Sequence, residues 1–246
     1  MNRRHPNRPN RTLAAGACLL ALAALSAPAP AAAKAFLPTL ESPVFSRVRV
    51  ITADGRTIDG NVTAHTQIYR GLRNITLVDD AGVKHKLAGN DIRQIIVPLD
   101  PDLRLALMAE ATTTIEKTIR TDYEPIHEVP AMVYDAIAWP KPDKRLLLQR
   151  VNPGFDTLIQ VYGLPLAKEG KWLGGDHHPA WFGDEVNAYL VVKRGGEPVR
   201  IEEDDYRDYF ETLFADCPPL LEGVPRKERK FRDFADHVYE YELRCR

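Results

Sequence analysis

The amino-acid sequence predicts an α+β fold: a small N-terminal antiparallel β meander or open barrel, then an antiparallel sheet packed by two C-terminal helices. Three observations predict it. Short apolar runs alternate with Asp and Gly turn signals between residues 45 and 97. The same strand-like pattern returns at 132–162 and 188–201. After residue 204, two stretches carry apolar side chains at helical spacing.

The chain of 246 residues therefore divides into four segments. Residues 1–35 are a predicted signal peptide and 36–100 a small β-module. Residues 101–128 form a helical connector, and 129–246 contain the antiparallel sheet with the C-terminal helices.

Three features predict the signal peptide. Four arginines precede an apolar run from Leu13 to Leu25, which is too short to span a bilayer. Ala33-Lys34-Ala35 then fits a small-x-small cleavage site, with cleavage after Ala35 or close to it. We therefore expect an exported protein, periplasmic or secreted, with no membrane span after cleavage.

Charge excludes one class of partner. Removing residues 1–35 takes away five basic residues and no acidic ones, so 33 basic and 34 acidic residues become 28 and 34. The mature chain then has a formal net charge of −6. Because nucleic-acid binders need a basic surface, we expect no nucleic-acid partner.

In the β-module, turn signals separate five short strands. Asp54-Gly55 predicts a hairpin between the strand around Val48 and Val50 and the strand from Thr57 to Val62. A second hairpin joins Leu72–Val78 to Val83–Leu87, and Ile92–Val97 ends at Pro98. One face is basic, which we interpret as a solvated surface: Arg47, Arg49, Arg56, Lys84 and Lys86.

The middle of the chain predicts a helix and then a second sheet. Asp102 to Thr118 contains helix formers, although three threonines weaken its end. Strands are expected at Met132–Trp139, Lys144–Val151 and Phe155–Tyr162. A hairpin over 188–201, turning at Arg194-Gly195-Gly196, completes five strands.

Two amphipathic helices follow, with Asp204 as a candidate cap of the first. Pro218 and Pro219 separate them, because proline cannot continue a helix. His237 lies one position from Val238 of the second apolar stripe and is predicted to be a partly exposed surface residue. The two stripes are Tyr206, Tyr209, Phe210, Leu213 and Phe214, then Phe231, Phe234, Val238 and Tyr241.

Two cysteines, Cys217 and Cys245, remain after the signal peptide. Export exposes them to an oxidising compartment, so we expect a disulfide between them. Such a bridge contributes about 3–4 kcal/mol by the chain-entropy estimate. Their separation of 28 positions gives no Cys-x-x-Cys redox motif, and two free buried thiols are the alternative.

The runs ITADGRTIDGNV and ITLVDDAGVKHKLAGNDIRQIIV are similar to the opening module of a loose group of uncharacterised exported bacterial proteins. AYLVVKRGGEPVRI and LFADCPPLLEG are similar to the closing section of that group. These motifs are turns and caps and contain no catalytic residue. The resemblance implies the two-part fold and export, and it implies no activity.

One loop concentrates histidine, carboxylate and tryptophan. Residues 174–185 hold Asp176, His177, His178 and Asp184, whose side chains are typical zinc ligands or an acid/base pair. Adjacent histidines on an extended chain point in opposite directions, and no His-x-x-x-His spacing is present. The alternative is a solvated Gly-rich loop whose aromatic side chains cover a sheet end.

The sequence contains no nucleophile elbow, phosphate loop or dinucleotide fingerprint. It therefore predicts a non-enzymatic binding or envelope-associated protein that uses no cofactor and no catalytic residue. Its partner is an unknown protein or envelope component, and the edge strands are candidates for pairing with a partner strand. The alternative is a metal-dependent hydrolase or small-ligand binder that uses the 174–185 loop.

Overall fold

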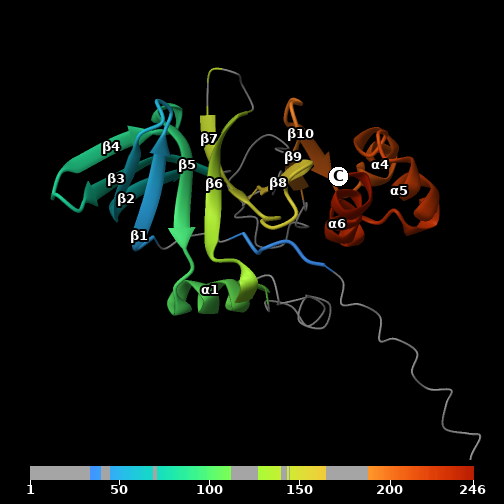
Figure 1. Cartoon of the computed structure of the whole chain (residues 1–246), viewed down its shortest axis with the longest axis horizontal. Helices are drawn as coiled ribbons and strands as arrows, with labels where there is room; N and C mark the ends of the chain where they lie inside the picture. Colours follow the sequence, from blue (N-terminus) through green and yellow to red (C-terminus); the bar gives the residue numbers. More distant parts are fainter. Residues whose placement is uncertain are drawn as a thin grey trace, which may run out of the picture. The chain divides into compact units, whose positions relative to one another are not determined.

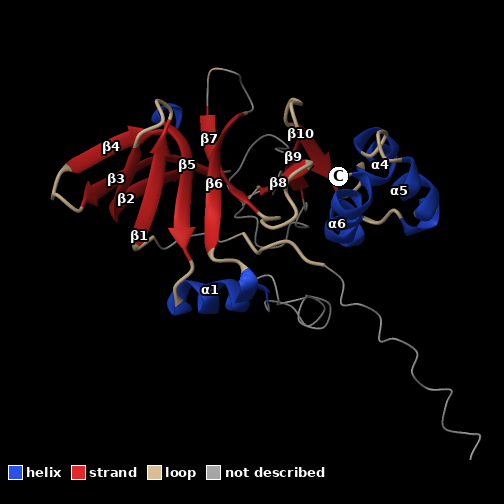
Figure 2. Ribbon diagram, in the orientation of Figure 1, coloured by secondary structure: helices blue, strands red, loops and turns tan. Residues whose placement is uncertain are grey.

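The computed structural model describes residues 34–39, 45–68, 71–111, 127–139, 143, 145–164 and 188–246. All of them belong to one compact unit, Ala33–Arg246 (Figure 1). Figure 2 shows that strands dominate and that helices are few, which confirms the predicted α+β class. Within the described ranges, no helix combines the length and apolar character needed to cross a membrane.

Strands of the described residues join in a single antiparallel sheet, in the order β10-β9-β8-β7-β6-β5-β1-β2-β3-β4. The antiparallel pairing that the turn signals predict is confirmed. The strand bounds are β1 Arg47–Thr52, β2 Thr57–Ile68, β3 Gly71–Asp79, β4 Lys84–Ala88, β5 Ile92–Pro98, β6 Ala131–Ala138, β7 Arg145–Arg150, β8 Ile159–Gly163, β9 Ala188–Lys193 and β10 Val199–Glu202.

The sheet closes on itself, so the predicted N-terminal meander or open barrel, followed by a separate second sheet, is wrong. Strand β6 continues the first module by pairing with β5, and Leu72 of β3 pairs with Leu147 of β7. Strands β7, β6, β5, β1, β2 and β3 therefore form a closed six-stranded barrel, with β4, β8, β9 and β10 outside it.

Closure depends on how β4 and β7 share one edge of β3. Strand β4 pairs only with Asn74–Val78, which leaves the start of β3 open to β7. At that point a Cβ on Gly71 would lie 2.8 Å from Leu148 Cδ2 and 2.9 Å from the Leu147 carbonyl oxygen. Only a residue without a side chain allows this close approach.

The barrel has an aliphatic interior. Helix α1, Pro101–Ala111, adds Leu103 and Leu107 to the same core, while Leu105 on its other side is 70% exposed. The predicted connector helix is thus present up to Ala111, and 112–126 lie outside the described residues. The interior is formed mainly by Val48, Val50, Leu72, Ile75, Leu77, Ile92, Ile95, Val97, Met132 and Leu147.

A second, aromatic core joins the outer strands to the C-terminal helices. Strands β8, β9 and β10 contribute Ile159, Val161, Val191 and Ile201 to it. The helices are α4 Tyr206–Leu213, α5 Pro218–Gly223 and α6 Phe234–Cys245, and the short 3-10 turns are η1 Gly89–Asp91, η2 Arg226–Glu228 and η3 Phe231–Asp233. Their buried side chains include Tyr206, Phe210, Leu213, Phe214, Leu220, Phe234, Val238 and Tyr241.

Three local predictions for the C-terminal region need correction. Tyr209 is 38% exposed and lies outside the buried stripe. Pro218 and Pro219 separate the two predicted helices, but they also begin a third helix, α5, because proline fits the first helical turn, where the backbone N–H groups have no partner. His237, predicted at the surface, is buried at 6% exposure.

The predicted disulfide is confirmed. Cys217 and Cys245 are bonded, with their Cα atoms 5.7 Å apart. Cys217 precedes α5 and Cys245 is the last residue of α6, so the bond ties these two helices together. The aromatic core therefore has a covalent closure, whereas the barrel is closed by backbone hydrogen bonds.

Candidate functional site

The four residues of the predicted metal site, Asp176, His177, His178 and Asp184, lie outside the described residues. The structure therefore does not test that hypothesis. Within the ranges that it does describe, no three or more His, Cys, Asp or Glu side chains converge as a metal site would require.

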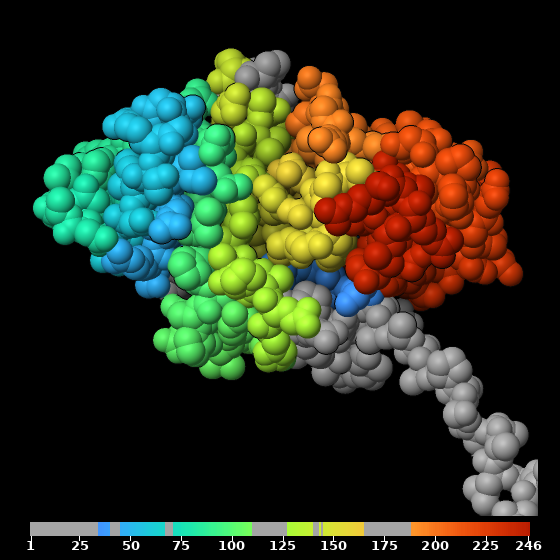
Figure 3. All heavy atoms as spheres, in the orientation of Figure 1, coloured from blue at the N-terminus to red at the C-terminus, as the bar shows by residue number. Residues whose placement is uncertain are grey.

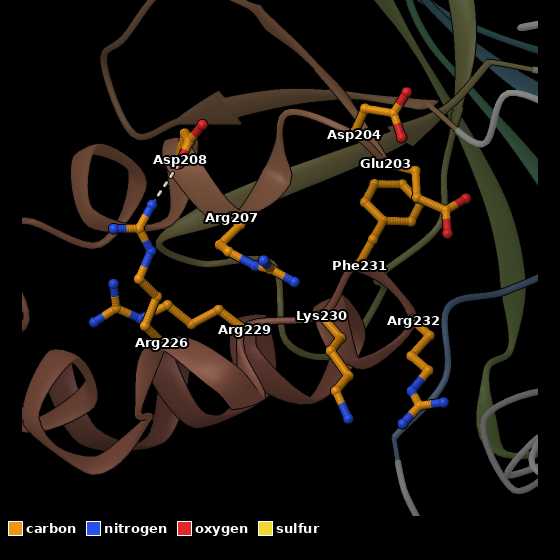
Figure 4. Close-up of a pocket in the computed structure, with 9 residues that line it drawn as sticks. All are labelled: Glu203, Asp204, Arg207, Asp208, Arg226, Arg229, Lys230, Phe231 and Arg232. Atoms are coloured by element: carbon orange, nitrogen blue, oxygen red, sulfur yellow. Dashed lines mark hydrogen bonds and ion pairs between the residues drawn. The ribbon is translucent and has the colours of Figure 1, made fainter.

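A polar hollow of about 590 Å³ lies between the start of α4 and the η2–η3 segment. We call it the basic hollow, because five of its nine lining side chains are cationic and three are anionic (Figure 4). Its lining consists of Glu203, Asp204, Arg207, Asp208, Arg226, Arg229, Lys230, Phe231 and Arg232.

One arginine of the hollow is fixed in place. Arg229 is 8% exposed, and its Nη1 donates to Glu211 Oε1 at 2.6 Å. Its Nε donates to the Val224 carbonyl at 3.2 Å, and its guanidinium lies 4.7 Å from the centre of the Phe210 ring. The nearby guanidinium lowers the pKa of Glu211. Arg229 is therefore held in a fixed position in the lining of the hollow, and Glu211 neutralises its charge.

Two further arginines have acidic neighbours at the surface. Arg226 Nη2 donates to Asp208 Oδ1 at 3.1 Å, and both side chains are more than 70% exposed. Arg232 lies 3.6 Å from Asp233. Exposed pairs of this kind are weak, so an incoming anion can compete for both guanidinium groups.

Arg207 and Lys230 are different. Neither side chain has a hydrogen bond or ion pair with any described residue, and both are exposed. Figure 4 shows Arg207 extending from α4 towards the η2–η3 segment, while the carboxylates of Glu203 and Asp204 lie at the other end of the hollow. Two unneutralised cations thus lie away from these acids.

Behind the hollow lies a buried aromatic layer. The Phe231 ring stacks on Tyr189 at 5.5 Å between ring centres and meets Tyr206 edge-on at 5.8 Å. The Tyr206 hydroxyl and His237 Nδ1 are 2.6 Å apart. Burial lowers the pKa of His237 to about 4, so the imidazole is neutral at pH 7 and shares one hydrogen bond with the hydroxyl.

A second charged cluster is largely buried, and its charged groups bind one another. Arg150 donates to Asp135 and to Asp156, both at 2.5 Å. Asp135 also accepts from Gln94 at 2.8 Å and from the Tyr162 hydroxyl at 3.0 Å. Because each charged group of this cluster is bonded to a group of opposite charge, we interpret it as the polar joint between barrel strands β5, β6 and β7 and outer strand β8.

The basic face predicted on the β-module is largely neutralised. Arg47 pairs with Asp80 at 2.6 Å, and Arg49 pairs with Asp59 at 2.8 Å. Arg56 pairs with Asp54 at 2.8 Å. The nearby Arg49 lowers the pKa of Asp59. This face therefore carries much less uncompensated charge than its arginines suggest.

The sheet edges are also poor candidates for pairing with a partner strand. Edge strand β4 exposes Lys84 and Lys86, and lysines on an edge oppose strand addition. Edge strand β10 has four residues, follows Pro198, and pairs Arg200 with Glu202 at 3.0 Å. The basic hollow is thus a better binding candidate than either edge.

The sequence contains one signal for the basic hollow, which was not among the predicted sites. Residues 226–232 read Arg-Lys-Glu-Arg-Lys-Phe-Arg, with five cations in seven positions. A charge run of this kind usually marks a solvated surface. Only the structure shows that Arg207, far away in the sequence, lines the same hollow.

No protein-family model, curated protein or solved structure matches this chain. The likeness to a group of exported bacterial proteins therefore stays a prediction, and any functional proposal has to rest on the chain's own residues.

Proposed function

We propose that this chain is an exported, periplasmic binding protein without catalytic activity. Its basic hollow holds an anionic group, a carboxylate or a phosphate, of a protein or envelope component. One observation carries the proposal: Arg207 and Lys230 line the same hollow without an acidic partner among the described residues, in a chain that is acidic once the signal peptide is removed.

The chemistry of the lining supports anion recognition. Arginine and lysine stay protonated at pH 7, so they offer a permanent positive charge. The planar guanidinium of Arg207 can donate two parallel hydrogen bonds to a carboxylate or phosphate, while Lys230 acts as a mobile point charge. Arg229, held by Glu211 and Phe210, supplies a rigid wall behind them.

The lining also suggests which anions fit best. Glu203 and Asp204 repel negative charge at one end, so a ligand with a single compact anionic group fits better than a long anionic polymer. Phe231 adds an apolar contact beside the cations. A terminal carboxylate, an acidic side chain or a phosphomonoester of an envelope component meets these requirements.

Calorimetric titration of the purified mature protein tests the proposal. The probes are inorganic phosphate and a short N-acetylated peptide whose only charged group is its terminal carboxylate, each at low ionic strength, where exposed charges are least screened. Binding to one of them is expected, and it should weaken as salt is added. The two probes separate phosphate from carboxylate as the recognised group.

A matched pair of variants locates the site. Arg207→Gln with Lys230→Gln should weaken binding about tenfold or more, since losing one charge-assisted bond costs about 1.5 kcal/mol. Lys84→Gln with Lys86→Gln makes the same change in net charge on β4 and should leave affinity nearly unchanged. Equal affinities of the two double variants, or no binding of either probe by the wild type, would refute the proposal.

A further inference from the structure

The first described residues are part of the folded protein rather than a loose leader. The Phe36 ring packs edge-on against Tyr189 at 5.0 Å and Phe234 at 5.4 Å between ring centres. Leu37 is 3% exposed in the barrel core, and its N–H donates to the Val151 carbonyl at 2.7 Å. Neighbouring residues thus enter the two cores. Figure 3 shows this segment, in blue, lying against α6, in red.

Lys34 attaches the start of this segment to α6 in two ways. Its backbone N–H donates to Asp236 Oδ1 at 2.6 Å. Its Nζ lies 5.3 Å from the centre of the Tyr239 ring. Asp236 is in the first turn of α6, where a carboxylate is also favoured by the helix dipole. The segment and α6 are therefore joined at Lys34.

The sequence offers two small-x-small cleavage sites at this point. Ala33-Lys34-Ala35 places cleavage before Phe36, whereas Ala31-Ala32-Ala33 places it before Lys34. Cleavage before Phe36 would remove these contacts of Lys34 with α6. Cleavage before Lys34 keeps them and converts the amide that contacts Asp236 into an amine.

The geometry points to the Ala33–Lys34 bond as the processing site and to the Lys34 α-ammonium as a structural ion-pair partner of Asp236. A signal peptidase adds water to the Ala33 carbonyl carbon and breaks the C–N bond. Ala33 leaves as a carboxylate, and the Lys34 nitrogen takes up protons to become an ammonium group. The inference rests on the proposed export.

Processing strengthens the contact with Asp236. Before cleavage the carboxylate accepts a hydrogen bond from a neutral amide. Afterwards it faces a full positive charge with three donors, and charge-assisted hydrogen bonds are roughly twice as strong as neutral ones. Export and cleavage therefore complete a contact that holds the start of the mature chain on α6.

The direct test is expression of the full chain in a Gram-negative host, followed by fractionation and intact-mass measurement of the protein. The expected result is a periplasmic protein that begins at Lys34. A periplasmic protein that begins at Phe36 would overturn the inference and leave the export proposal standing. Unprocessed full-length protein in the cytoplasm would overturn both.

A second measurement tests the ion pair itself. Proteins that begin at Lys34 and at Phe36 are released from a fusion by a site-specific protease, each with and without Asp236→Asn. In the Lys34 form the substitution should lower Tm by about 2–4 °C. In the Phe36 form it should lower Tm by clearly less, because the ammonium partner is gone.

Glu222→Gln is the matched control, since it removes one exposed acidic charge from α5. It should change Tm equally in the two forms. If Asp236→Asn also has the same effect in both forms, Lys34 does not pair with Asp236 and the inference fails.

Discussion

The barrel and the C-terminal helical region are closed in different ways. Backbone pairing runs around the whole barrel, and its interior is aliphatic. The helical region has an aromatic core and is closed by a disulfide between α5 and α6. The barrel therefore depends on a continuous hydrogen-bond ladder, and the helical region depends on side chains and one covalent bond.

The two regions also differ in how they treat surface charge. On the barrel, Arg47, Arg49 and Arg56 each face an aspartate. In the helical region, Arg207 and Lys230 line a hollow without such a partner among the described residues. Charged side chains that pair with one another are typical of a structural surface. An unpaired cation can instead bind an anionic ligand. This contrast favours the helical region as the site of the binding that we propose.

The largest expected effect comes from the polar joint between the barrel and outer strand β8. Arg150→Met leaves the carboxylates of Asp135 and Asp156 without their cation in a largely buried position. Breaking a buried pair in this way should lower the free energy of unfolding by about 3–5 kcal/mol. Urea unfolding at pH 7 measures it. Arg49→Met, which removes an exposed pair, should cost less than about 1 kcal/mol.

Removing the disulfide should destabilise the helical region and leave the backbone pairing of the barrel intact. Cys217→Ala with Cys245→Ala is expected to lower the free energy of unfolding by about 3–4 kcal/mol. Amide hydrogen exchange should become faster in α5 and α6 and should change little in the barrel strands. Equal acceleration in β1 and β5 would show that the barrel also depends on this bond.

His237 should make the helical region sensitive to acid. Burial holds its pKa at about 4 in the folded state, below the ordinary value of 6.5; Arg229 also lowers it, while Asp233 and Glu240 raise it. The unfolded chain therefore binds the proton first. Stability is complete above pH 6.5 and falls by about 3 kcal/mol as the pH drops towards 4.

Unfolding free energies measured between pH 7 and 4 check this slope. His237→Gln should flatten it, whereas His127→Gln at an exposed position should leave it unchanged. An identical slope in the two variants would show that the loss comes from other groups.

The smallest effect concerns barrel closure. Gly71→Ala places a methyl group against the Leu147 carbonyl and Leu148 and should cost about 1–3 kcal/mol. Gly196→Ala, in the β9–β10 turn outside the barrel, meets no atom closer than 3.4 Å and should cost less. Thermal unfolding compares the two. A larger loss from Gly196→Ala would contradict the closure that we describe.

Local signals predicted much of this fold. Asp54-Gly55 and Asp79 to Gly82 are turns in which glycine adopts a positive φ, 87° at Gly55 and 80° at Gly82. The two remaining cysteines predicted the disulfide. In each case, neighbouring residues or the chemistry of one residue type carries the information.

Long-range features could not be predicted in the same way. Strand alternation does not reveal that β7 meets β3, because both β4 and β7 can occupy that edge.

The burial of His237, in contrast, could have been predicted. With Phe234, Val238 and Tyr241 it follows the spacing i, i+3, i+4 and i+7, which places it in the buried stripe of the helix. Its polar side chain led us to the wrong prediction.

The most direct test of recognition by the helical region is an NMR titration of the mature protein with the anion that binds. Amide shifts should concentrate at residues 203–208 and 226–232 and disappear in the Arg207→Gln, Lys230→Gln variant. Shifts concentrated on the barrel around Arg47 and Arg49, and retained in that variant, would contradict the account.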